Sequence, residues 1–124
     1  MVFKRDSMES APIFSVIFME EAAAFLSSLP DKPRRKIYYN IDKSRYFIDR
    51  ELFKKLENTD IWEFRTLYEG NCYRLFAFWD TNNEALVVAT HGFHKKTQKT
   101  PAKEITKAER LKETYFNDKK QQTI

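Results

Sequence analysis

Two arginines in neighbouring aromatic-rich segments are the first residues whose types and spacing point to chemistry. Arg65 and Arg74 lie on either side of the turn-forming pair Glu69-Gly70. If that pair forms a two-residue turn between antiparallel strands, Arg65 lies directly opposite Arg74 on one face, whereas a three-residue turn would stagger them. Because facing like charges destabilise a sheet, the first register predicts a shared anion or a nearby carboxylate such as Glu63. Two ordinary exposed strand arginines are the alternative.

A second group of candidate residues lies between His91 and Lys103, which contains four lysines, two histidines and no carboxylate. Such a segment suits a phosphate backbone, and a solvated lysine-rich loop is the alternative. His91 and His94 are the only histidines, and imidazole is suited to proton transfer near neutral pH. The alternative for each histidine is a purely structural role. The expected phosphate contacts in this segment are Lys95, Lys96 and Lys99.

No metal site or cofactor is expected, because two histidines without a nearby carboxylate or cysteine make an incomplete ligand set. The single cysteine, Cys72, excludes an internal disulfide and is expected to be a small buried residue rather than a nucleophile. Aromatic residues of the same segments could stack on bases, but packing in the core explains them better. These aromatic residues are Trp62, Phe64, Tyr73 and Trp79.

Composition indicates one globular domain. Hydrophobic residues make up 42% of the 124 residues and aromatic residues 15%, which is enough for one core. The net charge of +4 decides little by itself. The apolar run Ile13–Met19 is too short to span a membrane and is followed by Glu20-Glu21, so we expect a cytoplasmic protein without a membrane anchor.

Hydrophobic periodicity predicts the order β-α-α-β-β-β-α in one α+β domain over residues 13–116, with a loose leader at 1–12 and a frayed tail at 117–124. Pro30 should end the first helix, and Pro33 should begin a second one whose apolar side carries Ile37, Ile41 and Ile48. The expected elements are a strand at 13–18, helices at 20–29 and from 33, a turn or short helix at 51–56, strands at 61–67, 72–79 and 85–91, and a helix from 101 to about 116.

Three blocks, in order, carry a resemblance to a known family: Phe53–Arg65, Tyr73–Phe76 and His91–Pro101. Together they resemble the phage-derived, HigB-like branch of the RelE/ParE toxin superfamily, and the resemblance extends from about Ile13 to Tyr115. It implies a small twisted antiparallel sheet flanked by an N-terminal helical hairpin and a C-terminal helix. That fold agrees with the order of elements expected from periodicity.

The resemblance also implies a function. It indicates the toxin of a type II toxin–antitoxin system, which cleaves mRNA, often in the ribosomal A site, and is blocked by a cognate antitoxin protein. The strand arginine of the family's Tyr-Arg motif falls on Arg74, and a basic position on the preceding strand falls on Arg65. Cationic positions after the last strand match Lys95 and Lys96, and the tyrosine that some relatives place near the scissile nucleotide has no counterpart.

The mechanism expected for such an endoribonuclease is metal-free attack by a ribose 2′-OH on the adjacent phosphate. Arg65 and Arg74 would stabilise the charge of the phosphorane, and His94 or His91 would transfer the proton. Two alternatives are a ParE-like toxin, which has the same fold but inhibits DNA gyrase and does not cut RNA, and a non-catalytic RNA-binding module that needs the basic face but not the histidines.

Overall fold

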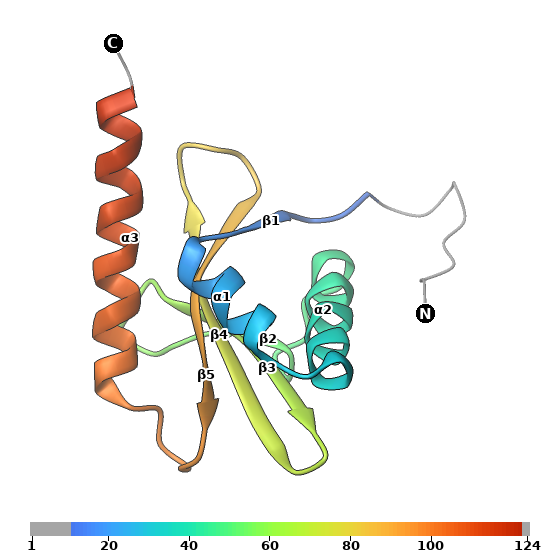
Figure 1. Cartoon of the computed structure of the whole chain (residues 1–124). Coiled ribbons are helices and arrows are strands. Elements are labelled where there is room, and N and C mark those ends of the chain that lie inside the picture. The colour runs from blue at the N-terminus through green and yellow to red at the C-terminus, as the bar shows by residue number, and fades with distance from the viewer. Residues whose placement is uncertain (1–10, 123–124) are drawn as a thin grey trace.

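The computed structural model of the protein describes residues 11–122, so most of the expected leader and the last two residues lie outside the described range. Within that range, three helices and a five-stranded sheet form an α+β arrangement (Figure 1). The elements in chain order are β1 (Ser15–Phe18), α1 (Glu20–Ser28), α2 (Asp31–Tyr46), β2 (Phe53–Lys55), β3 (Trp62–Tyr68), β4 (Asn71–Asp80), β5 (Leu86–Lys95) and α3 (Ala102–Gln122).

The sheet has the strand order β1-β5-β4-β3-β2 and is mixed. Strands β3, β4 and β5 form the antiparallel meander that the sequence predicts. β1, in contrast, runs parallel to β5, so this edge differs from the antiparallel sheet that the sequence predicts. Residues 19–85 separate the two strands and are long enough for the crossover that a parallel pair requires.

The turn between β3 and β4 sets the register of the two arginines. Glu69 and Gly70 both adopt positive φ, at 48° and 79°, as a tight two-residue hairpin turn requires. Tyr68 is therefore paired with Asn71, and Arg65 with Arg74. The register expected from the sequence is confirmed.

Helices cover both faces of the sheet and enclose two cores. α1 and α2 pack on one face against residues such as Phe64 and Leu75, whereas α3 packs on the other face against Phe76 and Phe78 (Figure 1). The strand aromatics belong to the first core, as expected: Phe64 and Tyr73 are buried, and both tryptophans are partly buried against them. The two faces follow from the alternation of side chains along a strand.

The segment expected to be a turn or short helix contains β2 instead. Phe53 is fully buried, and its ring centroid lies 4.3 Å from that of Phe64 and 4.7 Å from that of Trp62. A strand of three residues is too short to show an alternating pattern. Its pairing with β3 and its aromatic contacts, both tertiary, account for this strand.

β5 is longer than expected and continues through the segment that the sequence indicated as the start of a loop. A bulge at Thr90 interrupts its pairing with β4, because Phe76 pairs with His91 whereas Ala77 pairs with Ala89. Beyond the bulge, Gly92 lies under the ring of Phe25 from α1, where any Cβ would clash with the ring.

The helix ends also differ from the expectation. α2 begins at Asp31, two residues before Pro33, and ends before Ile48, which is exposed outside the helix. α3 continues to Gln122 instead of ending near Phe116. Lys119 explains the extension, because its Nζ lies 2.6 Å from Oδ2 of buried Asp80 and holds the last turns of α3 on the sheet.

Candidate functional site

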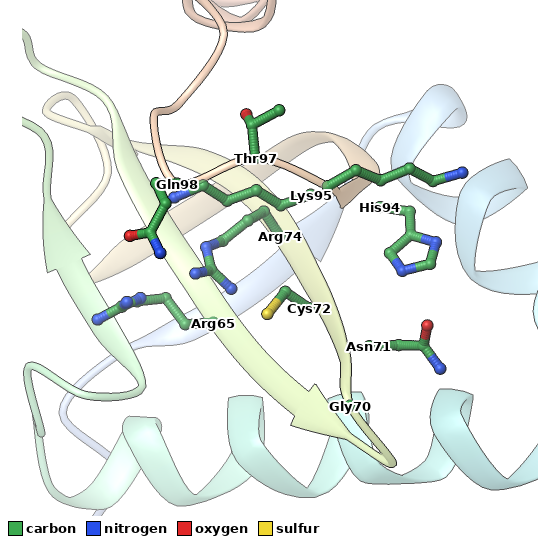
Figure 2. Close-up of a pocket in the computed structure, with 10 residues that line it drawn as sticks. Arg65, Gly70, Asn71, Cys72, Arg74, His94, Lys95, Thr97 and Gln98 are labelled. Carbon is green, nitrogen blue, oxygen red and sulfur yellow. The ribbon is translucent and has the colours of Figure 1, made fainter.

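An open pocket of about 710 Å³ lies between the β3–β4 hairpin and the end of β5 with its following loop (Figure 2). α3 does not line it, because the loop after β5 leads the chain away before this helix begins. The residues that line the pocket are Arg65, Gly70, Asn71, Cys72, Arg74, His94, Lys95, Lys96, Thr97 and Gln98.

One buried carboxylate lies between the two arginines of the pocket. Nε of Arg74 is 3.2 Å from Oε1 of Glu63, and Nε of Arg65 is 3.7 Å from Oε2 of the same residue. All three side chains lie on the same face of the sheet, because they occupy alternate positions of β3 and the partner position on β4. The carboxylate that the sequence predicts beside the pair is therefore Glu63.

The two arginines and the single glutamate together leave a net positive charge in a partly buried site. Burial lowers the pKa of Arg74, but an arginine remains cationic in proteins. Among the described residues, both Nε atoms and Oε1 of Glu63 are buried and lack a well-aligned hydrogen-bond partner. Such buried atoms are uncommon outside functional sites, and here they belong to two cations that share one anion.

Lys95 adds a third cation on the same face. It pairs with Cys72 of β4, one step along the face from Arg74 and its partner Phe93. Burial lowers the pKa of Lys95, and the positive charges of Arg74 and Arg65 lower it further against the opposing effect of Glu63. An ammonium group that loses its proton more readily than usual can take part in proton transfer.

His94 borders the pocket from the opposite face of the sheet. It pairs with Tyr73, and the two rings are stacked with centroids 5.1 Å apart. Figure 2 shows that the imidazole points away from Arg65 and Arg74. The structure thus brings Lys95, rather than His94, next to the arginines.

His91 lies outside the pocket, between the sheet and α3. Its Nε2 is 3.1 Å from Oε1 of Glu104, and its Nδ1 is 3.0 Å from Oγ1 of Thr90. Burial lowers the pKa of His91, although the hydrogen bond with Glu104 opposes this effect. A neutral, enclosed imidazole is what this environment favours.

The basic loop divides between the pocket and solvent. Lys96 lines the pocket, whereas Lys99 does not, and the carbonyl of Lys99 accepts a hydrogen bond of 2.8 Å from the hydroxyl of Thr97. Sequence reasoning missed Asn71 and Gln98 as lining residues. Turn and loop amides carry no chemical pattern that would distinguish them in a sequence.

Residues 11–122 contain neither a cluster of metal ligands nor a membrane-spanning helix. No group of three or more histidine, cysteine, aspartate or glutamate side chains in this range could hold a metal ion. None of its helices combines the length and the apolar character needed to cross a membrane.

Comparisons with known proteins place the chain in a family. The family model described as "Phage derived protein Gp49-like (DUF891)" matches residues 24–113, which include every residue of the pocket. No curated protein matches the sequence significantly. One similar solved structure is the toxin–antitoxin complex RelBE2 from Mycobacterium tuberculosis, with 19% identity over 68% of this chain and all of the matched chain, and a TM-score of 0.48. The chain belongs to the Gp49-like family of phage-derived proteins, which is a RelE/HigB-type toxin family.

Proposed function

We propose that this toxin is an endoribonuclease that cleaves mRNA in the pocket at the end of the sheet. The observation that supports this most directly is the facing pair of Arg65 and Arg74, with Lys95 beside them and a single carboxylate between them. Three cations around one site match the charge that develops on a phosphate during cleavage. Two facing arginines destabilise a sheet unless an anion offsets their repulsion, and a bound phosphate would supply such an anion.

The proposed reaction begins when a base removes the proton from a ribose 2′-OH. The 2′-oxygen then bonds to the adjacent phosphorus, the bond from phosphorus to the 5′-oxygen breaks, and an acid protonates that oxygen. The products are a 2′,3′-cyclic phosphate and a free 5′-hydroxyl. Arg65 and Arg74 stabilise the phosphorane, and they do so in a site whose partial burial strengthens the interaction.

We assign the proton transfer to Lys95, the role that the sequence analysis left open between His94 and His91. Lys95 is the group with a lowered pKa that lies in the pocket on the face of the arginines. His91 stays as a structural residue under α3, and Lys96 contacts the phosphate backbone. The cationic character of the pocket does not favour a bound metal ion, so the reaction is proposed to be metal-free.

The proposed partners follow from this function. The substrate is mRNA in the cytoplasm. The ribosome aligns this RNA in the pocket, which has few proton-transfer groups and depends on that alignment. A cognate antitoxin protein holds the toxin inactive until it is removed.

An RNA cleavage assay in a translation reaction tests the proposal, with wild type beside Arg74→Ala and with Lys55→Ala as a control that removes an exposed cation outside the pocket. Wild type and the control should cleave mRNA in the presence of a chelator that spares the ribosome's magnesium, and leave 2′,3′-cyclic phosphate ends. Arg74→Ala should lose about a hundredfold or more in rate. Full cleavage by a folded Arg74→Ala protein would contradict the assignment.

A further inference from the structure

A second hollow, of about 390 Å³, shares a wall with the pocket. Arg65, Cys72 and Arg74 line both, so the two spaces lie next to each other at the arginine pair. The second hollow then extends over the edge of β3 toward α2. Its other lining residues are Lys36, Tyr39, Asn40, Lys43, Glu51, Leu52, Thr66 and Leu67.

The hollow exists because β2 covers only part of β3. β2 pairs with β3 from Trp62 to Phe64, and the last backbone contact on that side is the 2.7 Å hydrogen bond donated by the amide of Arg65 to the carbonyl of Leu52. Further along, Leu67 pairs with β4 on one side, and 65% of it is exposed. The strand edge is therefore accessible in the part of β3 next to the site.

α2 is held along this open edge. Nδ2 of Asn40 donates a hydrogen bond of 3.1 Å to Oγ1 of Thr66, and both side chains are buried. This contact fixes the helix beside β3. The ribbon of α2 passes close to the β3–β4 hairpin in Figure 2. Residues on the neighbouring turns of α2 are thereby positioned at the hollow.

These turns present two cations and an aromatic ring. Lys36, Tyr39 and Lys43 follow the i, i+3, i+7 spacing that places residues on one side of a helix. Nζ of Lys36 lies 5.2 Å from the centroid of the Tyr39 ring. The lining residues of the hollow include one carboxylate, the exposed Glu51, against four cations.

We propose that this hollow binds a nucleotide that flanks the cleavage site in single-stranded RNA. The base stacks on Tyr39, and Lys36 and Lys43 contact the backbone phosphates on either side. A ring combined with cations is how proteins hold single strands without reading their sequence. Because Arg65 and Arg74 form part of both walls, one strand passes from the pocket into the hollow, and this step rests on the proposed function. An acidic protein segment would use the lysines but would not need the ring.

Binding measurements with uncleavable RNA separate this subsite from catalysis. The probes are fluorescent 2′-O-methyl RNAs, one a dinucleotide and one of about six nucleotides, measured by anisotropy at several salt concentrations. The variants are Lys36→Ala with Lys43→Ala, Tyr39→Ala and Tyr39→Phe. The matched control is Lys32→Ala with Lys55→Ala, which removes two exposed lysines that line neither space. Circular dichroism and melting establish that each variant is folded.

Wild type should bind the longer RNA more tightly than the dinucleotide, and the control should match it. The Lys36/Lys43 variant should lose most of this advantage, and the slope of log affinity against log salt should flatten by about 1.4. Tyr39→Ala should weaken binding of the longer RNA by about fivefold or more, while Tyr39→Phe should keep wild-type affinity. Binding of the dinucleotide should change little in every variant.

A Lys36/Lys43 variant with the wild-type affinity and salt slope for the longer RNA would overturn the subsite, and so would wild-type protein that fails to bind it. If the Lys36/Lys43 variant kept its RNA binding and lost only its binding to an acidic protein, the occupant of the hollow would be that protein. Length-dependent binding that responds to these variants, in a protein that cleaves no RNA, would keep the subsite and refute the nuclease.

Discussion

Glu63 has an unusual environment for a carboxylate. Its carboxylate is buried on the sheet between Arg65 and Arg74, where it offsets part of the repulsion between two facing guanidiniums. A buried charge that loses its partner is costly, because the remaining charge stays dehydrated. Glu63 thus supports the geometry of the candidate site, while the cations around it carry the charge that the proposed cleavage requires.

Removing this carboxylate should destabilise the fold. Glu63→Gln should lower the free energy of unfolding by on the order of 3 kcal/mol, since both guanidiniums then lack their anion. Urea unfolding followed by circular dichroism measures the loss. Glu57→Gln is the control, because Glu57 is an exposed glutamate. Equal stabilities for the two variants would show that Glu63 does not hold the pair, and added phosphate should restore part of the loss.

Lys95 and Lys96 are adjacent lysines with different expected roles. As a general base, Lys95 should give a cleavage rate that rises with pH through its lowered pKa, and Lys95→Ala should slow single-turnover cleavage by about a hundredfold or more. Lys96→Ala should mainly weaken binding and flatten the salt slope by about 0.7. Lys95→Arg should keep the wild-type salt slope but should cleave as slowly as Lys95→Ala, because a guanidinium does not give up its proton.

His94→Ala provides the contrast in the same assay. Its imidazole lies on the opposite face of the sheet from the arginines, so cleavage should proceed at close to the wild-type rate. If His94→Ala slowed cleavage as strongly as Lys95→Ala, the proton transfer would have to be assigned to the histidine.

His91 should make stability depend on pH. Burial lowers its pKa in the folded protein below the ordinary value of 6.5. The unfolded chain therefore binds a proton at a higher pH than the folded one. The stability from neutral His91 is present above about pH 6.5 and is lost as the pH falls toward its folded pKa. Unfolding free energies at about pH 7 and pH 5 should fall less in His91→Gln than in wild type, and equal decreases would contradict this interpretation.

At the scale of elements, the contact between α1 and β5 depends on a glycine. Gly92 lies where the ring of Phe25 covers the strand, and a Cβ at that position would overlap the ring. A glycine inside a strand ordinarily weakens it, so its presence here reflects the close approach of the helix. The same contact fixes the part of β5 that carries Lys95.

Gly92→Ala should therefore destabilise the protein by about 1–3 kcal/mol through overpacking. Phe25→Leu combined with Gly92→Ala should recover part of this loss, because the smaller side chain leaves room for the methyl group. A double-mutant cycle by urea unfolding measures the coupling. Additive effects of the two substitutions would indicate that the ring does not limit the space at Gly92.

At the scale of the whole molecule, the end of α3 is held against the sheet by a contact between residues far apart in the sequence, Lys119 and Asp80. Burial would raise the pKa of Asp80, but hydrogen bonds from Lys119 and Tyr115 lower it overall, while the pKa of Tyr115 rises to about 12. Both partners lie within 2.7 Å of Oδ2 of Asp80. The C-terminal turns of α3 thus contribute to the fold.

A protein truncated after Phe116 tests this role. It should lose about 1–3 kcal/mol of stability, because buried Asp80 keeps Tyr115 but loses the cation of Lys119. Lys119→Ala should reproduce most of the loss, whereas Lys120→Ala, at an exposed neighbouring position, should not. Thermal melting compares the three. A truncated protein as stable as wild type would support the frayed tail expected from the sequence.

Local rules were sufficient to predict the arginine pair and much of the core. Given a two-residue turn at Glu69-Gly70, the two-residue period of strands is enough to place Arg65 opposite Arg74, and the structure confirms both. Periodicity likewise determined the two N-terminal helices and the burial of Phe64 and Tyr73. Each of these results depends on neighbours within a few residues.

Only the tertiary structure decided which residue near the end of β5 faces the arginines. Ala89 belongs to the core under α1 and α2, so regular alternation would have placed His94 on the face of Arg74 and Lys95 on the other. The bulge at Thr90 adds one residue and reverses that order. A bulge arises from pairing with a distant strand, as does the partial cover of β3 by β2 that opens the second hollow. Neither contact leaves a local pattern in the sequence, and both shape the candidate site.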